Sequence, residues 1–462
     1  MQADSRKIIS ENIVADRSKL KIICVFLHRI YFGRIPYERQ YRGKKRKAMN
    51  ITELQQSYAS HPNVEGVCRL LKDNSVRHLY CGGLYASAAS LFSSVLVQRA
   101  TCPLVFILGD MEEAGYFYHD LTQILGTEQV LFFPSSFRRA IKYGQKDAAN
   151  EILRTEVLSR LQKGEEGLCV VTYPDALAEK VVSRKELGEN TLKLHAGERV
   201  DMNFVTDVLR SYGFEYVDYV YEPGQYAVRG SIIDVFSFSS EYPFRIDFFG
   251  DEVESVRTFE VETQLSKEKK ESIVIVPDLS HSLEKKGSGG MVSFLDFLPS
   301  DSLLAMRDFL WLRERIQTVH DESLTPQAIA ARESEENGAI TLEGKLIDGG
   351  EFTLRALDFR RMEFGNKPTG TPDATVSFHT TVQPIFHKNF DMVAESFREY
   401  LSRHYTIYIC SDSLKQTDRI RAIFEDRGDN ISFTAVERTL HEGFADDTLR
   451  ILPLIHISEP TR

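Results

Sequence analysis

The sequence lacks the short motifs that mark zinc sites, redox centres and hydrolase active sites. Its six cysteines include no CxxC pair, and its twelve histidines include no HExxH. No GxSxG elbow presents a nucleophilic serine, and the His and Asp residues form no constellation that can be placed in a triad. We therefore assign no catalytic residue and no metal-ligating residue to this chain.

A functional phosphate loop is also lacking, although the layout of one is present. A short apolar strand runs into Gly82 and Gly83, and a helix follows. The GxxxxGK[ST] pattern needs a Lys on the phosphates and a hydroxyl on Mg²⁺, yet no basic residue lies between Tyr80 and Gln98. We predict a degenerate loop kept for packing, with no cofactor bound by this chain.

Long hydrophobic runs are absent as well. The best candidate for a membrane segment, Ile22–Leu27, has only six apolar residues before His28 and is far too short to span a bilayer. Most cysteines lie in or beside strand-like apolar runs such as Leu168–Val171, which favours buried, reduced thiols and a cytoplasmic location. With 462 residues, 42% of them hydrophobic and 27% charged, the chain has the composition of about three globular domains.

The two ends differ from the rest of the chain. Residues 1–48 hold 13 basic and 4 acidic side chains, so the net charge of -10 divides into +9 there and -19 over residues 49–462. An acidic body repels polyphosphates, which argues against nonspecific nucleic-acid binding as the main activity. We interpret residues 1–48 as a non-native basic extension ahead of Met49, with a nucleic-acid-binding arm as the alternative, and residues 454–462 as a sequencing-adapter tail outside the fold.

Between these ends the pattern predicts an α/β protein. Short apolar strands alternate with helical periods from Val64 to Thr172, which favours a parallel sheet covered on both faces. Alternating strands with tight turns then indicate a small inserted α+β domain. The predicted domains are a degenerate helicase-like α/β domain in two parts (49–194 and 279–365), the inserted α+β domain (195–278), a linker (366–373) and a truncated second α/β domain (374–453).

Within the inserted domain, the stretch from Phe244 to Phe259 predicts a hairpin. A period of two places Phe244, Ile246 and Phe248 on a core face and Arg245, Asp247 and Phe249 on the other. The connection Gly250-Asp251 suits a tight turn. Arg245 and Phe249 are residue types that bury large flat surfaces against a partner. The alternative is a surface Arg245 paired with Asp247 and a Phe249 covered by the nearby helix.

The same region carries a long and specific resemblance. Tyr226-Ala-Val-Arg-Gly230, Ile232-Ile-Asp-Val-Phe236 and Pro243-Phe-Arg-Ile-Asp-Phe-Phe-Gly-Asp-Glu252 resemble the module shared by the bacterial excision-repair proteins. The resemblance extends to about residues 49–452 and is to the N-terminal portion of the transcription-repair coupling factors. The excinuclease helicase subunit UvrB shares the module but keeps a functional phosphate loop and a tyrosine-rich hairpin, both of which this sequence lacks.

The resemblance implies an adaptor that recruits the damage-recognition protein UvrA in nucleotide excision repair. It implies UvrA-binding roles for Arg229, Arg245 and Phe249. In this family the complete protein is an ATP-dependent DNA translocase that displaces stalled RNA polymerase, so RNA polymerase, DNA, ATP and Mg²⁺ are expected only for domains downstream of this chain. The alternative is a UvrB-like, nucleotide-hydrolysing helicase subunit with an unusual loop.

Overall fold

The computed structural model describes residues 49–136, 148–279, 290–323, 344–386 and 389–455, and every structural statement below concerns these residues. Residues 1–48 and 49–462 are separate units. The predicted basic extension, including Ile22–Leu27, therefore lies outside the described residues. No helix in the described ranges is long and apolar enough to cross a membrane.

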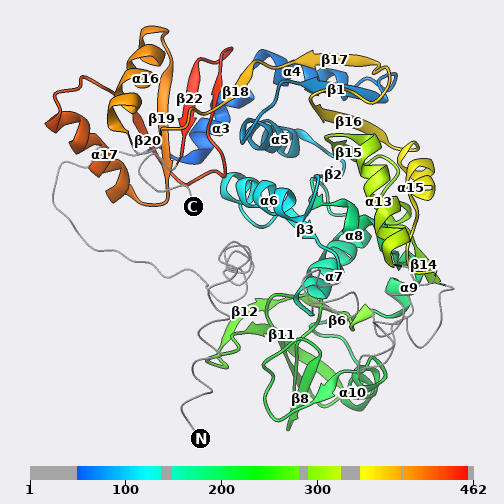
Figure 1. Ribbon diagram of the computed structural model, residues 1–462. Helices are drawn as coiled ribbons and strands as arrows, with labels where there is room; N and C mark the ends of the chain where they lie inside the picture. Colours follow the sequence, from blue (N-terminus) through cyan, green and yellow to red (C-terminus); the bar gives the residue numbers. More distant parts are fainter. Residues whose placement is uncertain (1–48, 137–147, 280–289, 324–343, 387–388, 456–462) are drawn as a thin grey trace, which may run out of the picture. The chain divides into compact units, whose positions relative to one another are not determined.

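A seven-stranded parallel sheet forms the centre of the first domain (Figure 1). The strands lie in the order β17-β1-β16-β15-β2-β4-β3, and each neighbouring pair is parallel. β1 to β4 and β15 are buried at every position, which explains why they read as continuous apolar runs. The strands are β1 (His78–Gly82), β2 (Leu104–Ile107), β3 (Val130–Phe133), β4 (Cys169–Thr172), β15 (Leu303–Met306), β16 (Arg360–Gly365) and β17 (Ala374–Ser377).

Helices cover this sheet on both sides. Figure 1 shows α5 (Ala88–Arg99) and α6 (Met111–Leu125) on one side, with α13 (Phe309–Ser323) and α15 (Gly349–Ala356) on the other. Helix α6 starts where predicted because the Asp110 carboxylate accepts a hydrogen bond from the backbone N–H of Glu113. The remaining elements are α4 (Pro62–Leu70), α7 (Ala148–Lys163), α8 (Pro174–Ala178), α9 (Arg184–Glu189), α12 (Phe294–Phe297) and the strand pair β5 (Val181–Val182) and β14 (Met291–Val292).

The inserted module starts and ends in neighbouring strands. β6 (Leu192–His195) pairs antiparallel with β13 (Ser272–Ile275), so the chain enters and leaves the module at one place. Between them, α10 (Met202–Ser211) precedes a six-stranded sheet with the order β12-β11-β10-β9-β8-β7. Its strands are β7 (Glu215–Tyr216), β8 (Gln225–Arg229), β9 (Ile232–Val235), β10 (Phe244–Phe249), β11 (Glu252–Phe259) and β12 (Ser266–Lys270).

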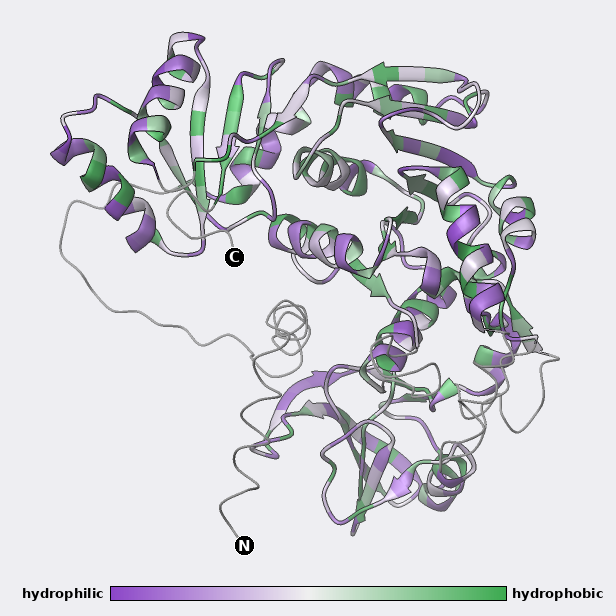
Figure 2. Ribbon diagram, in the orientation of Figure 1, coloured by the Kyte–Doolittle hydropathy of each residue, from purple (hydrophilic) through white to green (hydrophobic). Residues whose placement is uncertain are grey.

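A second α/β unit follows, with the strand order β18-β21-β22-β19-β20. Its helices α16 and α17 show bands of both colours in Figure 2, as expected for helices with one buried side. Met49 extends this sheet, since its N–H donates to Ala435 and its carbonyl accepts from Glu437. Helix α3 (Ile51–Ala59), which follows Met49, packs mainly against α5 and α6 of the first domain. The elements of the second unit are β18 (Thr380–Val382), α16 (Phe390–Ser402), β19 (Thr406–Ser411), α17 (Leu414–Asp426), β20 (Thr434–Glu437), β21 (Phe444–Asp446) and β22 (Ile451–Leu454).

The structure differs from two of the predicted boundaries. β17 was expected in the second α/β domain, but it is an edge strand of the first sheet beside β1, where the Asp373 carboxylate accepts from the backbone N–H groups of Arg77 and His78. The tail was expected to lie outside the fold from Leu454 onward. Leu454 and Ile455 are buried, and Leu454 continues the parallel pairing with Ile409 in β19, whereas residues 456–462 of the predicted tail lie outside the described residues.

Candidate protein-interaction site

The hairpin β10–β11 has the two faces that the sequence predicts. Along β10, Phe244, Ile246 and Phe248 are buried, whereas the alternate residues are more exposed. The buried set packs in one hydrophobic cluster with Val205 and Leu209 of α10. Helix α10 therefore covers this inner face of the sheet. The other face, which we call the outer face, carries polar side chains beside a small apolar cluster of Val220, Ala227, Phe236 and Phe259.

Phe249 lies at the end of the outer face. It is 79% exposed, so the alternative in which a helix covers it is wrong. Gly250 follows with a φ of 61°, a left-handed conformation that glycine adopts without strain, and this turn pairs Phe249 with Glu252. Most of this large aromatic ring is therefore not used in folding the hairpin.

The strand register places the charged residues of the outer face in two rows. Asp234 of β9 lies directly opposite Arg245 of β10, which lies opposite Arg257 of β11. In the next row, Arg229 of β8 pairs with Ile232, and Ile232 pairs with Asp247. Directly opposite residues of antiparallel strands point to the same face. The side chains of Arg229, Arg245 and Phe249 thus all belong to the outer face.

Asp234 joins the two predicted arginines. Its side chain is completely buried, and its Oδ1 and Oδ2 accept hydrogen bonds from Nε and Nη2 of Arg245 at 2.8 and 2.9 Å. Nη2 of Arg229 donates to the same Oδ2 atom. The predicted alternative for Arg245, a surface pair with Asp247, is therefore wrong. Its carboxylate partner is one strand away.

Arg245 is held on two further sides. Its Nη1 donates to the backbone oxygen of Gln264 at 3.0 Å, and its guanidinium carbon lies 4.5 Å from the centre of the Phe259 ring. The hydrogen bonds to Asp234 raise the pKa of Arg245 above its ordinary value, so the group is charged at any physiological pH. Only 15% of its side chain is exposed, against 36% for Arg229.

A second carboxylate–arginine pair lies beside the first. Nη2 of Arg257 donates to Oδ2 of Asp247, which also accepts from the Ser255 hydroxyl at 2.8 Å. The side chain of Arg257 is 42% exposed and that of Asp247 only 14%. In both pairs the carboxylate is the more buried partner, so the outer face presents mainly guanidinium groups.

The sequence reasoning missed three members of this face: Asp234, Arg257 and Tyr219. The Tyr219 ring is 51% exposed and lies 5.2 Å from the Arg229 guanidinium. A signal for Asp234 was present, since a charged residue inside the apolar strand Ile232-Ile-Asp-Val235 needs a partner when buried. The sequence offers no comparable signal for Tyr219.

The degenerate phosphate loop is filled by the chain itself. The backbone oxygen of Gly82 accepts from the N–H of Phe378, and that of Gly83 accepts from the hydroxyl of Thr380 at 2.8 Å. Gly83 has a φ of 77°, and a Cβ placed on it would come within 2.0 Å of the Phe378 carbonyl oxygen. The residues present therefore do not fit a nucleotide phosphate at this loop.

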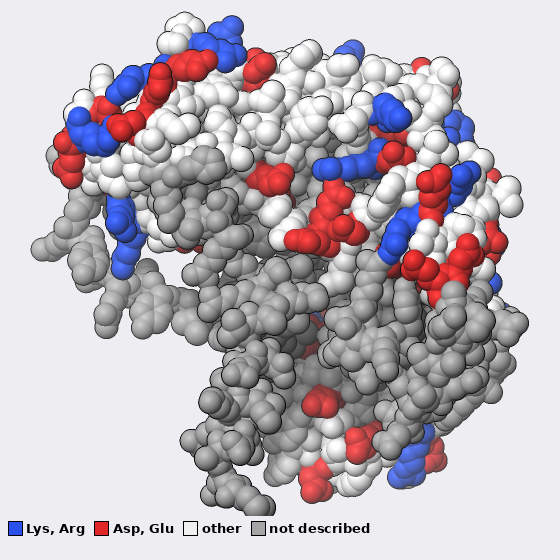
Figure 3. All heavy atoms as spheres, in the orientation of Figure 1, with Lys and Arg blue, Asp and Glu red and all other residues white. Residues whose placement is uncertain are grey.

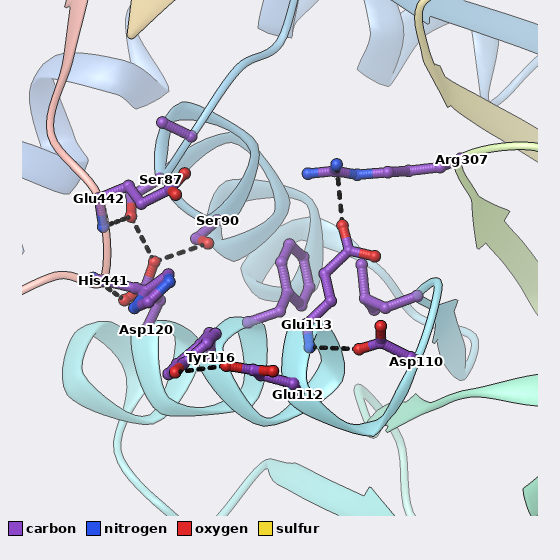
Figure 4. A pocket seen from close by; sticks show the side chains of 13 residues that line it. Ser87, Ser90, Asp110, Glu112, Glu113, Tyr116, Asp120, Arg307, His441 and Glu442 are labelled. Atoms are coloured by element: carbon purple, nitrogen blue, oxygen red, sulfur yellow. Dashed lines mark hydrogen bonds and ion pairs between the residues drawn. The ribbon is translucent and has the colours of Figure 1, made fainter. Parts of the chain in front are cut away.

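A carboxylate also lies at the start of α5, where a phosphate would be expected. Buried Asp120 accepts from the hydroxyls of Ser87 and Ser90 at 2.6 and 2.9 Å, and its other oxygen accepts from the N–H of His441 (Figure 4). The adjoining pocket has a volume of about 300 Å³. Its charged lining is mostly acidic, with Arg307 the exception, and comprises Asp110, Glu112, Glu113, Asp120, Arg307 and Glu442.

This acidic lining disfavours nucleotides for a second reason. Figure 3 shows a cluster of acidic side chains near the middle of the face, with few basic ones beside it. Arg307, the one arginine of the lining, pairs with Glu113 at 2.8 Å. A triphosphate would meet net repulsion here. In the described residues, no group of three or more His, Cys, Asp or Glu side chains is placed to hold a metal ion.

Comparison with known proteins agrees with the geometry of the module. A family model described as the UvrB interaction domain matches residues 192–281, which are the module from β6 to just beyond β13. We call the inserted module the UvrB interaction domain after the family model that it matches. The UvrB interaction domain of this chain therefore carries Asp234, the three arginines and Phe249 on the outer face of its sheet.

Curated relatives extend the similarity beyond the UvrB interaction domain. The transcription-repair-coupling factor of Escherichia coli (strain K12) is 29% identical over 198 residues, which are 42% of this chain and 17% of the relative. That of Bacillus subtilis (strain 168) is 30% identical over 42% of this chain and 16% of the relative. That of Staphylococcus aureus (strain bovine RF122 / ET3-1) is 22% identical over 79% of this chain and 35% of the relative.

These matches confirm the resemblance to the transcription-repair coupling factors. They span a minor share of each relative's length. The α/β fold with a parallel sheet and smaller additional sheets is confirmed as well. The alternative of a nucleotide-hydrolysing UvrB-like subunit has less support.

Proposed function

We propose that this chain is the adaptor portion of a transcription-repair coupling factor and recruits UvrA through the outer face of its UvrB interaction domain. The observation that carries the proposal is Phe249, an aromatic side chain 79% exposed on the same face as Arg229 and Arg245. Exposed aromatic rings beside arginines are the residues that dominate binding energy at protein interfaces. The family match of residues 192–281 points to the excision-repair system.

The remaining parts of the proposal concern the whole protein. RNA polymerase and DNA are its proposed further partners, with ATP and Mg²⁺ used by a motor outside this chain. The first two relatives extend well beyond the matched region, since 17% and 16% of their lengths align. A cytoplasmic location fits three buried, unpaired cysteines, Cys81, Cys169 and Cys410.

A binding titration of purified chain against purified UvrA tests the proposal. We expect saturable binding that Arg229→Ala, Arg245→Ala and Phe249→Ala each weaken by about 2 kcal/mol or more, the scale of an interface hot spot. The Arg245 effect should shrink at high salt if its partner is a carboxylate at the rim. Failure of the unaltered chain to bind UvrA would refute the proposal.

An ATPase assay on the same preparation separates the adaptor from the UvrB-like alternative. We expect no saturable ATP hydrolysis, because the loop at Gly83 is filled by Phe378 and the adjoining pocket is acidic. Clear, saturable hydrolysis by the purified chain would support the enzyme instead. Since a contaminating ATPase is the usual artefact, Gly83→Asp serves as a check, because a carboxylate in the loop repels phosphates: activity that survives this change does not come from this loop.

A further inference from the structure

We infer that Asp234 is a positioning residue for partner binding, which holds the guanidinium groups of Arg229 and Arg245 in the orientation that a partner meets. The inference rests on the proposed function, since it concerns the same face. Asp234 itself is completely buried, so a partner docking on the outer face would touch the arginines and not the carboxylate. Its effect on binding would have to pass through them.

The geometry around Asp234 fixes one arginine closely. Nε and Nη2 of Arg245 donate to the two carboxylate oxygens at 2.8 and 2.9 Å, which is the bidentate arrangement that sets the plane of a guanidinium group. Nη1 then donates to the Gln264 carbonyl at 3.0 Å. Of the five N–H groups of Arg245, these contacts use three. Two remain to meet a partner, and their direction is set by the plane that Asp234 imposes.

The same carboxylate also binds Arg229, which lies on the neighbouring strand β8. Ala227 lies directly opposite Asp234 in β8. Ala227 is buried in the apolar cluster with Val220 and Phe259, and Arg229, two residues further along the strand, brings its Nη2 to Oδ2 of Asp234. The Tyr219 ring lies 5.2 Å from the same guanidinium group. Arg229 is thus fixed by a carboxylate and a ring, yet 36% of its side chain is exposed.

Positioning and bulk charge predict opposite results when the carboxylate is neutralised. Asp234→Asn keeps the size of the side chain and makes the face more positive by one charge. If the arginines acted only through their charge on an acidic surface, this change would leave UvrA binding unchanged or strengthen it. If Asp234 orients them, the amide cannot accept both N–H groups of Arg245, since only one of its two terminal atoms is an acceptor. Binding then weakens although charge has been added.

The chain offers a matched control in its second α/β unit. Asp429 also lies between two arginines, Arg398 and Arg427, and its side chain is only 8% exposed. It belongs to the segment between α17 and β20, outside the UvrB interaction domain. Asp429→Asn therefore removes a carboxylate from a similar pair of guanidinium groups without altering the outer face.

The first experiment measures the Kd of the full chain for UvrA in four variants. We expect Asp234→Asn to raise Kd tenfold or more and Asp429→Asn to change it less than twofold. In the Arg229→Ala/Arg245→Ala background, adding Asp234→Asn should raise Kd less than twofold further, because the groups it positions are gone. An unchanged or lower Kd for Asp234→Asn alone would overturn the inference. So would a further large loss in that background, which would mean that Asp234 acts through the fold.

A second experiment needs no partner, so it separates failure of this inference from failure of the proposed function. In chain labelled with ¹⁵N-arginine, the Nε–H signal of Arg245, assigned by its absence in Arg245→Lys, should be protected from exchange with solvent. We expect that protection to fall at least tenfold in Asp234→Asn and to persist in Asp429→Asn. Equal protection in Asp234→Asn and unaltered chain would refute positioning, whatever UvrA does. If Asp234→Asn loses this protection but the unaltered chain does not bind UvrA, the positioning role stands and the proposed function is refuted.

Discussion

Phe249→Ala gives the sharpest test of the outer face, because folding and binding draw on different parts of this side chain. A phenylalanine offers about 200 Å² of surface, and Phe249 is 79% exposed. About 160 Å² is therefore left for a partner and about 40 Å² is used in folding. At about 25 cal/mol per Å², the binding share is at most about 4 kcal/mol and the folding share about 1 kcal/mol.

We therefore expect Phe249→Ala to weaken UvrA binding by about 2 to 4 kcal/mol while lowering the free energy of unfolding by about 1 kcal/mol or less. Calorimetric titration gives the first quantity and urea unfolding the second. Because the loss in binding exceeds the loss in stability, a merely damaged fold cannot account for the result.

Two phenylalanines of the same domain serve as controls. Phe204 on α10 is 54% exposed but belongs to the helix that covers the inner face, so Phe204→Ala should leave UvrA binding unchanged. Phe248, next in sequence to Phe249, is only 4% exposed, so Phe248→Ala should cost about 3 to 5 kcal/mol of stability. Equal effects of Phe249→Ala and Phe204→Ala on binding would refute the assignment of the outer face.

Three further predictions concern the rest of the chain. Burial lowers the pKa of His61 from 6.5, so the folded state disfavours its protonation, and the free energy of unfolding should fall as pH drops below about 6.5. His61→Asn, which keeps a helix-capping side chain, should reduce this dependence of the free energy of unfolding on pH. Gly83→Ala should destabilise the chain by more than about 1 kcal/mol, because its φ of 77° and the nearby Phe378 carbonyl oppose a Cβ, as urea unfolding would measure. In a Cys24→Ser background, a thiol reagent should label the half-buried Cys68 and Cys102 before unfolding. It should label the buried Cys81, Cys169 and Cys410 only after unfolding, since burial raises the pKa of these three thiols, to about 12 for Cys410.

The two faces of β10 could be predicted from sequence because both signals are local. Alternation with a period of two and a Gly-Asp turn lie within a few residues, so they place Phe249 on the same face as Arg245 without knowledge of any other strand. The partner of Arg245 could not be found in this way. Asp247 is nearer in sequence, but residues two apart along a strand are separated by about 6.6 Å. A directly opposite residue on the neighbouring strand lies within about 5.5 Å, which favours Asp234.

The errors at the domain boundaries have the same origin. The glycines and prolines of residues 366–373 correctly indicate a break in regular structure, but local sequence does not say to which sheet the next strand returns. That choice depends on the edge of β1, with which β17 pairs. The hydrogen bond between Arg77 and Asp373 joins these two segments across a sequence separation of 296 residues. Likewise, the missing lysine revealed a degenerate phosphate loop, whereas its filling by Phe378 and Thr380 required the three-dimensional arrangement.

The degenerate loop and the outer face use carboxylates in opposite ways, and the difference follows from which group is buried. At the start of α5, Asp120 takes the hydrogen bonds of two serines, and the adjoining pocket is lined by further carboxylates. An incoming anion meets like charge there. On the outer face, Asp234 and Asp247 are the buried partners and the guanidinium groups of Arg229 and Arg257 are the exposed ones. An incoming carboxylate meets the exposed arginines, which screen it from the buried aspartates behind them. A chain with a net charge of -10 can therefore still dock an acidic protein surface at this face.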